Sequence, residues 1–256
     1  MSYRYIVGDI HGTVELLKKL LDKIDKELNA HDKLIFLGDY IDRGKNSKQT
    51  IELLLQFHNS YPEQVVFLKG NHEDWLLNTY HNYSIHSWLL GMEGCTTIKS
   101  YSKQAAKVLE KEIRKFGMKL IYYKKKKKAP ALPYDIFFNS MPPDHISFFE
   151  QLRLYYEDEG IICSHAGLEI GMPLASQAEN ELLWSNTHSF IERWKGPKVL
   201  VLGHVHTYKI IADMYGKVII KDKVIFTDTG CPQTGILSAV RFPDGHVIQA
   251  VGRHQL

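Results

Sequence analysis

Residues 3–12 read YRYIVGDIHG and introduce a pattern that recurs along the chain. Residues 3–7 have the apolar character of a buried strand, and a carboxylate and an imidazole, Asp9 and His11, follow almost directly. Glycines on both sides of this pair allow the backbone to turn sharply. The pattern predicts that a rigid strand holds Asp9 and His11 as two ligands on a short turn.

The composition is that of an ordinary globular protein, with 256 residues of which 44% are apolar and 24% are charged. This length suits one large domain or two small ones. The formal charge of +3 is too small to indicate a nucleic acid or a membrane as a partner. No apolar run reaches the roughly 18 residues of a membrane span, and the first apolar segment is too short for a signal peptide.

The three cysteines, Cys95, Cys163 and Cys231, are widely spaced and form no CxxC pair. We therefore expect neither a disulfide framework nor a cysteine zinc site. Reduced cysteines are typical of the cytoplasm, which is the expected location.

Strands and helices alternate in the first part of the chain. Apolar runs predict strands at residues 3–7, 34–37 and 64–68. Between them, leucines and isoleucines at helical spacing predict amphipathic helices at residues 13–28 and 47–57. The resulting β-α-β-α-β order implies parallel strands that are joined by right-handed crossovers.

The remainder of the chain divides into a helical part and a strand-rich part. Helices are predicted at residues 75–77, 88–90, 103–116 and 145–156. Strands are predicted at residues 160–163, 198–202, 217–220, 224–226, 236–242 and 246–251. We therefore predict one α/β domain over residues 1–256, with a largely helical insertion at about residues 74–159.

Five times a strand-like run ends at a small residue, and side chains of the kind that bind metals follow. These stretches are GDIHG (8–12), GDYIDRG (38–44), GNHE (70–73), HAG (165–167) and GHVH (203–206). In an α/β sheet such loops gather at the carboxyl edge of the strands, where ligands bind. Residues far apart in sequence are therefore predicted to converge on one site.

The predicted site combines carboxylates, imidazoles and an amide but no thiolate. Oxygen and nitrogen ligands of this kind suit manganese, iron or zinc. The set is large enough for two ions with Asp39 as the bridge, and two ions about 3.5–4 Å apart suit in-line displacement at phosphorus. Arg43 adds a planar fork that matches a phosphate. His72 and Asp42 supply an acid and the carboxylate that orients it.

Read in this order, the motifs GDIHG, GDYIDRG, GNHE, HAG and GH resemble those of the phosphoprotein phosphatase family of metal-dependent serine/threonine phosphatases. The resemblance extends over residues 7–235 and is closest to the small bacterial and phage members, such as the phage lambda phosphatase. The segments WLL (88–90), LW (183–184) and DTG (228–230) belong to it as well. It implies the metallophosphoesterase (calcineurin-like) fold, a central β-sandwich flanked by helices with metals at one edge.

The resemblance also implies a role for each matching residue. The first metal ion would be held by Asp9, His11 and Asp39. The second ion would be held by Asp39, Asn71, His165 and His204. A hydroxide held by both ions would attack phosphorus, His72 would protonate the leaving oxygen with Asp42 holding its ring, and Arg43 would grip the phosphate. The expected metal is manganese, with iron or zinc as alternatives, and the expected substrate is a phosphorylated protein or a small phosphoester.

Two positions depart from the pattern of the small relatives. Asn186 stands where they usually have an arginine that forms a second phosphate clamp, and Arg193 is a candidate to replace it. His206 stands where they usually have proline. Because the wider superfamily often carries Gly-His-x-His with both histidines on metal, His206 is either a further metal ligand or a solvent-facing loop residue. Residues 124–128, five lysines, are either a solvated loop or a docking patch for an acidic partner.

A phosphomonoesterase is one of three functions that this pattern allows. Relatives that resemble symmetrical diadenosine tetraphosphatase hydrolyse dinucleoside polyphosphates, but they usually replace the aspartate of the second motif and end the third motif in Asp. This chain keeps Asp42 and Glu73, which favours the phosphomonoesterase. The third hypothesis is a binding module with a decayed site, and the intact ligand set argues against it.

Overall fold

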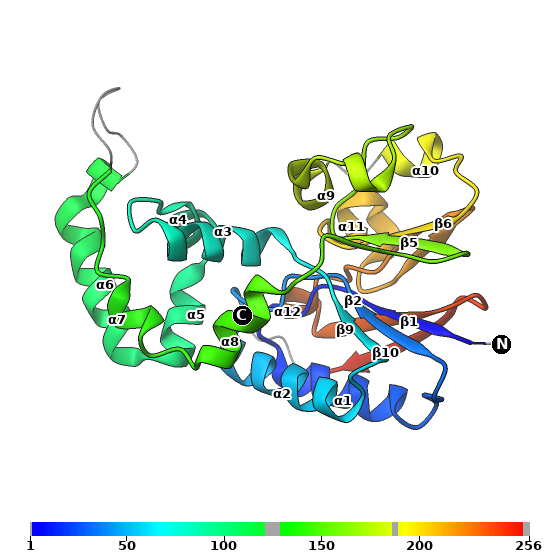
Figure 1. Cartoon of the computed structure of the whole chain (residues 1–256), viewed down its shortest axis with the longest axis horizontal. Helices are drawn as coiled ribbons and strands as arrows, with labels where there is room; N and C mark the ends of the chain where they lie inside the picture. The colour runs from blue at the N-terminus through cyan, green and yellow to red at the C-terminus, as the bar shows by residue number, and fades with distance from the viewer. Residues whose placement is uncertain (1, 121–128, 186–188, 253–256) are drawn as a thin grey trace.

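The computed structural model describes residues 2–120, 129–185 and 189–252. The lysine run at residues 124–128 and Asn186 therefore lie outside the described residues. Two five-stranded sheets pack face to face (Figure 1). The first sheet contains, in spatial order, β10 (His246–Val251), β9 (Ile236–Phe242), β1 (Arg4–Val7), β2 (Lys33–Phe36) and β3 (Val65–Phe67). The second contains β4 (Tyr155–Glu157), β5 (Ile161–Ser164), β6 (Val199–Leu202), β8 (Val224–Phe226) and β7 (Ile219–Lys221).

Each sheet is built around three parallel strands. β1, β2 and β3 run parallel in the first sheet, and β5, β6 and β8 run parallel in the second. The outer strands β9, β10, β4 and β7 are antiparallel to their neighbours. Helices α1 (Val14–Ile24) and α2 (Ser47–Ser60) connect the parallel strands of the first sheet. The predicted β-α-β-α-β order is thereby confirmed.

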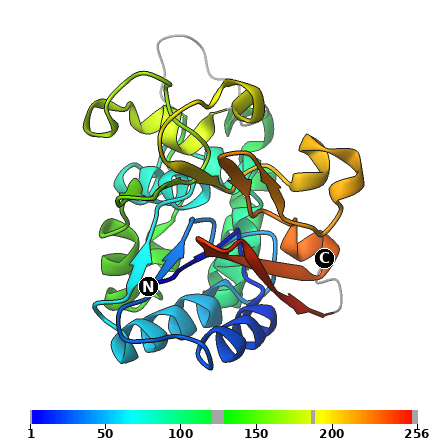
Figure 2. The ribbon, with the colours of Figure 1, turned by 90° about the vertical axis from the view of Figure 1, so that its right-hand side faces the viewer.

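The inner strands β1 and β2 of the first sheet are buried on both faces, which explains their continuous apolar sequence. In β1, Ile6 points into the core between the sheets and packs in one cluster with Val201 and Ile225 of the second sheet. Its neighbours Tyr5 and Val7 point the other way, into the cluster formed with the leucines of α1. Figure 2 shows the blue helix α1 and the light-blue helix α2 below the strands of this sheet.

Among the described residues between β3 and β4, six α-helices project from one end of the sandwich (Figure 1). They are α3 (Asn71–His81), α4 (Ser87–Gly91), α5 (Gly94–Tyr101), α6 (Lys103–Phe116), α7 (Asp135–Phe138) and α8 (Pro143–Glu150). Aromatic side chains such as Trp88, Phe137 and Phe149 form much of their shared core. This core is continuous with the one beneath the first sheet, so the helices pack onto the sandwich.

Four further α-helices complete the described part. They are α9 (Glu179–Trp184), α10 (Phe190–Arg193), α11 (Thr207–Ile210) and α12 (Cys231–Thr234). Leu182 of α9 and Phe190 of α10 pack on the outer face of the second sheet, whereas α12 lies against β9. No helix in the described ranges is both long and apolar enough to cross a membrane.

Two helix predictions were too long. Helix α8 ends at Glu150, not at residue 156, because Tyr155 and Tyr156 pair with β5 as strand β4. Helix α1 ends at Ile24, although Leu28 still packs against the core from the loop that follows. In both cases a local apolar pattern matched a helix, while contacts with distant segments determined where the helix stops.

A partly buried ion pair links the two sheets near the start of the chain. Arg4 Nε of β1 lies 2.6 Å from Asp158 Oδ2 in the turn between β4 and β5. Asp158 Oδ1 also accepts the backbone N–H groups of Gly160 at 2.8 Å and Ile161 at 3.1 Å. Partial burial opposes the shift, but the hydrogen bonds from Arg4 and these N–H groups lower the pKa of Asp158.

We expect Asp158→Asn to lower the free energy of unfolding by about 1–2 kcal/mol at pH 7, because it removes a charge-assisted hydrogen bond. A carboxyl group with a lowered pKa in the folded protein stabilises it above the ordinary aspartate value of 3.8 and loses this effect as the pH falls below it. The difference between the two proteins in urea unfolding should therefore narrow from pH 5 to pH 3. A constant difference, or one equal to that of the exposed control Asp22→Asn, would contradict the role of this pair.

Candidate metal centre

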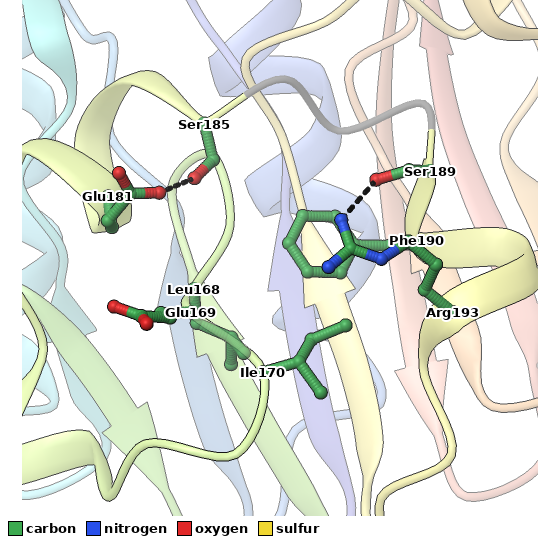
Figure 3. A pocket seen from close by; sticks show the side chains of 8 residues that line it. All are labelled: Leu168, Glu169, Ile170, Glu181, Ser185, Ser189, Phe190 and Arg193. Atoms are coloured by element: carbon green, nitrogen blue, oxygen red, sulfur yellow. Dashed lines mark hydrogen bonds between the residues drawn. The ribbon is translucent and has the colours of Figure 1, made fainter.

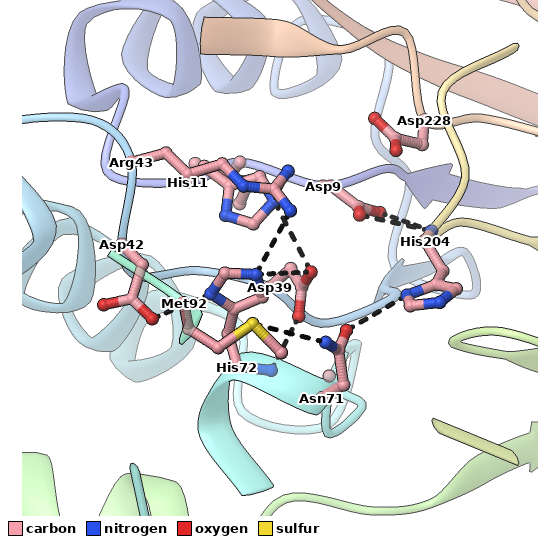
Figure 4. Close-up of polar contacts among 12 residues, drawn as sticks. Asp9, His11, Asp39, Asp42, Arg43, Asn71, His72, Met92, His204 and Asp228 are labelled. Carbon is pink, nitrogen blue, oxygen red and sulfur yellow. Dashed lines mark hydrogen bonds and ion pairs between the residues drawn. The ribbon is translucent and has the colours of Figure 1, made fainter. Parts of the chain in front are cut away.

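The carboxyl ends of parallel strands from both sheets meet at one edge of the sandwich (Figure 4). The residues that follow β1, β2, β3 and β5 converge there, and each is at most 3% exposed: Asp9, His11, Asp39, Asn71 and His165. His204 follows β6 and joins them. Since these groups are withdrawn from water, interactions among them act in a medium of low dielectric constant.

The loops that carry these side chains hold the backbone in an unusual conformation. Five of the seven described non-glycine residues with positive φ lie here: His11, Asp39, Asp42, Arg43 and His204. Such strained positions persist where surrounding contacts over-determine them, as at functional sites. Gly38 contributes by close approach, since a Cβ atom on it would lie 2.4 Å from the backbone nitrogen of Gly70.

Asp39 lies between two groups of possible metal ligands. Its Oδ2 atom is 3.4 Å from Nε2 of His11 and 3.8 Å from Nε2 of His72. Its Oδ1 atom is 3.5 Å from Nε2 of His165, on the side of His204. In each group the ligand atoms lie within 4.8 Å of one another. One carboxylate therefore offers an oxygen to each of two neighbouring sites.

Asn71 joins the second group through its side-chain oxygen. This Oδ1 atom lies 2.8 Å from Nε2 of His165 and 3.0 Å from Nδ1 of His204. Amide oxygen and imidazole nitrogen are both suitable metal donors. The second group thus contains a carboxylate, an amide and two imidazoles.

Asp9 and His206 lie beside these groups but belong to neither. The carboxylate of Asp9 accepts the backbone N–H of His204, with both oxygens at 3.2 Å. His206 is 5% exposed, with Nδ1 at 2.8 Å from the hydroxyl of Tyr208. The side chain of His206 is therefore buried next to the site and does not face solvent.

The histidines are held in the state that metal binding requires. Burial lowers the pKa of His11 and His165, and burial also lowers the pKa of His204 to about 3, so these rings are neutral. His11 and His165 each direct Nδ1 to a backbone carbonyl, of Ile41 and Leu37, at 2.9 Å. A donor at Nδ1 leaves the lone pair at Nε2, which faces Asp39.

The carboxylates supply the opposing charge. Burial alone would raise the pKa of Asp39, but the surrounding imidazoles and Arg43 lower it, so this group is ionised. Burial and the nearby carboxylates of Asp228 and Asp39 raise the pKa of Asp9. Clustered carboxylates with neutral imidazoles form a donor set that fits divalent transition metals, because a cation would offset the excess negative charge.

The calcineurin-like phosphoesterase family matches residues 4–229, which is most of the chain. The chain belongs to this family. A match of 38% identity to an uncharacterized protein of Caenorhabditis elegans, F44B9.9, extends over 91 residues and covers 32% of this chain and 36% of that protein. The chain thus spans about a third of the length of this curated relative.

Solved structures share the fold of this calcineurin-like phosphoesterase at low sequence identity. A putative diadenosine tetraphosphatase has a TM-score of 0.62 and 21% identity, with 98% of this chain and 94% of that chain covered. A serine/threonine phosphatase of Saccharomyces cerevisiae, similar to human PP5, has a TM-score of 0.55 and 17% identity, with 98% and 80% covered. The predicted α/β metallophosphoesterase fold is confirmed. One of these neighbours is named as a putative diadenosine tetraphosphatase and the other as a serine/threonine phosphatase.

In this calcineurin-like phosphoesterase, His72 is oriented by a chain of hydrogen bonds behind the metal-ligand groups. Its Nδ1 atom lies 2.7 Å from Oδ2 of Asp42. Asp42 in turn accepts the indole N–H of Trp88 at 2.9 Å and the hydroxyl of Thr97 at 2.5 Å. Burial acts against it, but the carboxylates of Asp39 and Asp42 raise the pKa of His72. Sequence reasoning found His72 and Asp42 but missed Thr97, and it noted Trp88 only as part of a shared segment.

Glu73 fixes the loop that carries Asp39. Its Oε2 atom accepts the backbone N–H groups of Asp39 at 2.8 Å and Gly70 at 3.0 Å, and its Oε1 atom accepts that of Tyr40 at 2.8 Å. The buried carboxylate thereby ties the loop after β2 to the start of α3. The position of Glu73 in the GNHE motif was the only sequence signal for this role.

The two candidate phosphate-binding arginines lie in different surroundings. Arg43 donates to Nε2 of His11 at 2.8 Å and lies 3.3 Å from Nε2 of His72, so it reaches the centre of the site (Figure 4). Arg193 lines a separate cavity of about 490 Å³, where it donates to Ser189 at 3.4 Å (Figure 3). Of these two arginines, Arg43 is therefore the one that contacts the metal-ligand groups.

We expect Mn²⁺ to raise the melting temperature of the chelator-treated protein. Ligand at 100 times its Kd stabilises by about 2.7 kcal/mol, which corresponds to about 5–10 °C for a chain of this size. Asp39→Ala should abolish the shift because Asp39 belongs to both groups, and His165→Ala should reduce it because His165 belongs to one.

The matched control is His145→Gln, since His145 is buried but bonds to Tyr101 in the helical region. This variant should change the melting temperature of the metal-free protein and leave the Mn²⁺ shift intact. If Asp39→Ala responds to Mn²⁺ like the unchanged chain, the two groups are not the binding site.

Proposed function

We propose that this calcineurin-like phosphoesterase is a metal-dependent phosphomonoesterase of the phosphoprotein phosphatase type that acts on phosphoserine or phosphothreonine in proteins. The observation that carries the proposal is the buried His72–Asp42 pair, joined at 2.7 Å, with Nε2 of His72 3.8 Å from the shared carboxylate of Asp39. Alkyl phosphates have poor leaving groups, so their hydrolysis depends on a positioned proton donor. A histidine with a raised pKa and a fixed ring orientation supports this role.

The donor set fits two divalent ions, and we propose manganese. His11 and Asp39 would hold one ion, with Asp9 as the third donor that the GDIHG motif supplies beside them. The other ion would be held by Asp39, Asn71, His165 and His204. When bound, such ions supply Lewis-acid chemistry at the phosphoryl group and lower the pKa of water. His206, which is buried beside these ligands, is proposed as a further donor.

Arg43 and His72 would act on the same phosphate from one side of the site. The guanidinium of Arg43 lies 3.3 Å from Nε2 of His72, and both face the carboxylate of Asp39. A phosphate held by the planar fork of Arg43 would therefore present its ester oxygen close to His72. Asp42 holds Nδ1, which leaves Nε2 of His72 to deliver a proton.

A symmetrical diadenosine tetraphosphatase is the second candidate. The likeness in fold to a putative enzyme of that kind, with a TM-score of 0.62, favours it. The network around Asp42 favours the phosphomonoesterase, because three side chains of this chain converge on that carboxylate.

We further propose that the chain works in the cytoplasm, with no nucleic acid or membrane as partner.

Release of phosphate from a phosphoserine peptide should exceed release of ADP from diadenosine tetraphosphate when both are compared by kcat/KM in Mn²⁺. Asp42 orients a proton donor that an alkoxide leaving group requires and that an ADP leaving group needs far less. The assay measures both products in the same protein preparation. Faster cleavage of diadenosine tetraphosphate would favour the second candidate.

We expect His72→Ala to lower kcat for the phosphopeptide by about 10²–10⁴-fold, with bound metal largely retained. Trp88→Phe, which removes one hydrogen bond to Asp42, should lower it by about tenfold, or about 1.4 kcal/mol. Both losses should be much smaller for p-nitrophenyl phosphate, because its leaving group needs little protonation.

The matched control is Trp194→Phe, which removes an indole N–H bonded to Lys198 in a distant loop. It should leave both rates unchanged. Equal losses for Trp88→Phe on the two substrates would show that Trp88 supports folding in general and not proton delivery.

A further inference from the structure

Asp228 is a buried carboxylate at the edge where the metal ligands meet, and it follows a sixth parallel strand. β8 runs parallel to β6, so its carboxyl end lies at the same edge as His204. Figure 4 places Asp228 beside Asp9 and His204. The five predicted strand ends did not include this one, although the small residue Thr227 separates the strand from Asp228 in a comparable way.

One oxygen of Asp228 lacks a hydrogen-bond partner in the described part of the chain. The residue is 0% exposed, and Oδ1 accepts the N–H of Gly230 at 2.9 Å. Oδ2 is buried and unpaired. An unpaired carboxylate oxygen in the interior costs free energy, so such an atom calls for a partner.

The turn around Asp228 is rigid, so the side chain cannot easily swing to water. The backbone oxygen of Asp228 accepts the N–H of Thr207 at 2.8 Å. The next residue, Thr229, donates to Ile236 at 2.7 Å and accepts from Ser238 at 3.1 Å. These contacts hold the backbone of the turn, and the N–H of Gly230 holds the other carboxylate oxygen, Oδ1.

The side chains near Oδ2 of Asp228 are of the kind that bind metals. Nε2 of His206 is 3.9 Å from Oδ2, which is too long for a hydrogen bond. The carboxylate of Asp9 lies beside that of Asp228 (Figure 4). Asp228 therefore has a carboxylate and an imidazole as neighbours at this edge of the site.

We propose that Asp228 is an additional donor to the cation held at Asp9, next to His206, which the Gly-His-x-His pattern already makes a candidate ligand. This inference rests on the proposed metal dependence of the site. It accounts for the unpaired oxygen of Asp228, for the burial of His206 and for the position of Asp9 outside the two groups centred on Asp39. The donor set on the Asp9 side then combines oxygen and nitrogen ligands.

The test is Mn²⁺ binding by the chelator-treated full chain, measured by isothermal titration calorimetry and by metal content after dialysis. Asp228→Asn keeps the shape of the side chain and an oxygen for Gly230, but it removes the charge. The variant should lower the affinity for one of the two Mn²⁺ ions by about 10–100-fold. The melting temperature of the metal-free variant should stay equal or rise, because an unpaired buried charge is gone.

Asp222→Asn, in the exposed turn between β7 and β8, is the matched control and should leave both ions unaffected. His206→Gln should weaken the binding of the same Mn²⁺ ion as Asp228→Asn. The double variant should lose less binding free energy than the sum of the two single losses, because both residues act on one cation.

Unchanged affinity and stoichiometry in Asp228→Asn, with a lower melting temperature of the metal-free protein, would overturn this inference and leave the proposed function standing. If the unchanged chain binds no Mn²⁺, the proposed function and this inference both fall.

Discussion

The structure depends on the position of one carboxylate, that of Asp39. Its two oxygens face different groups of imidazoles, so the loop after β2 must hold it in place between both sheets. The side chain of Glu73 accepts backbone N–H groups of this loop. The absence of a side chain at Gly38 lets the loop lie directly against Gly70, which precedes α3. These contacts sustain a left-handed backbone at Asp39, which an isolated loop would avoid.

The helical region contributes directly to this chemistry. Trp88 of α4 and Thr97 of α5 both donate to Asp42, which holds the ring of His72. The packing of aromatic side chains in these helices therefore sets the direction of a buried imidazole. The helices between β3 and β4 thus support His72, a residue at the edge of the β-sandwich.

Burial serves two purposes at the site. It keeps His11, His165 and His204 neutral, so that each retains a lone pair for a cation. Burial also raises the pKa of Asp9, and it leaves one oxygen of Asp228 without a partner among the described residues. A divalent cation would bind the lone pairs of these imidazoles and would also pair with the carboxylates. The donor set therefore argues for a metal site.

The sequence by itself determined the order of strands and crossovers, the bounds of β9 and β10, and the motif residues that gather at one edge, because each depends on local spacing or on a turn at a strand end. Only the tertiary structure decided that Tyr155 and Tyr156 form a strand, that Trp88 and Thr97 bond to Asp42, and that Asp228 joins the site. These features depend on contacts between segments tens of residues apart, and no local pattern records which distant partner a buried polar group will meet.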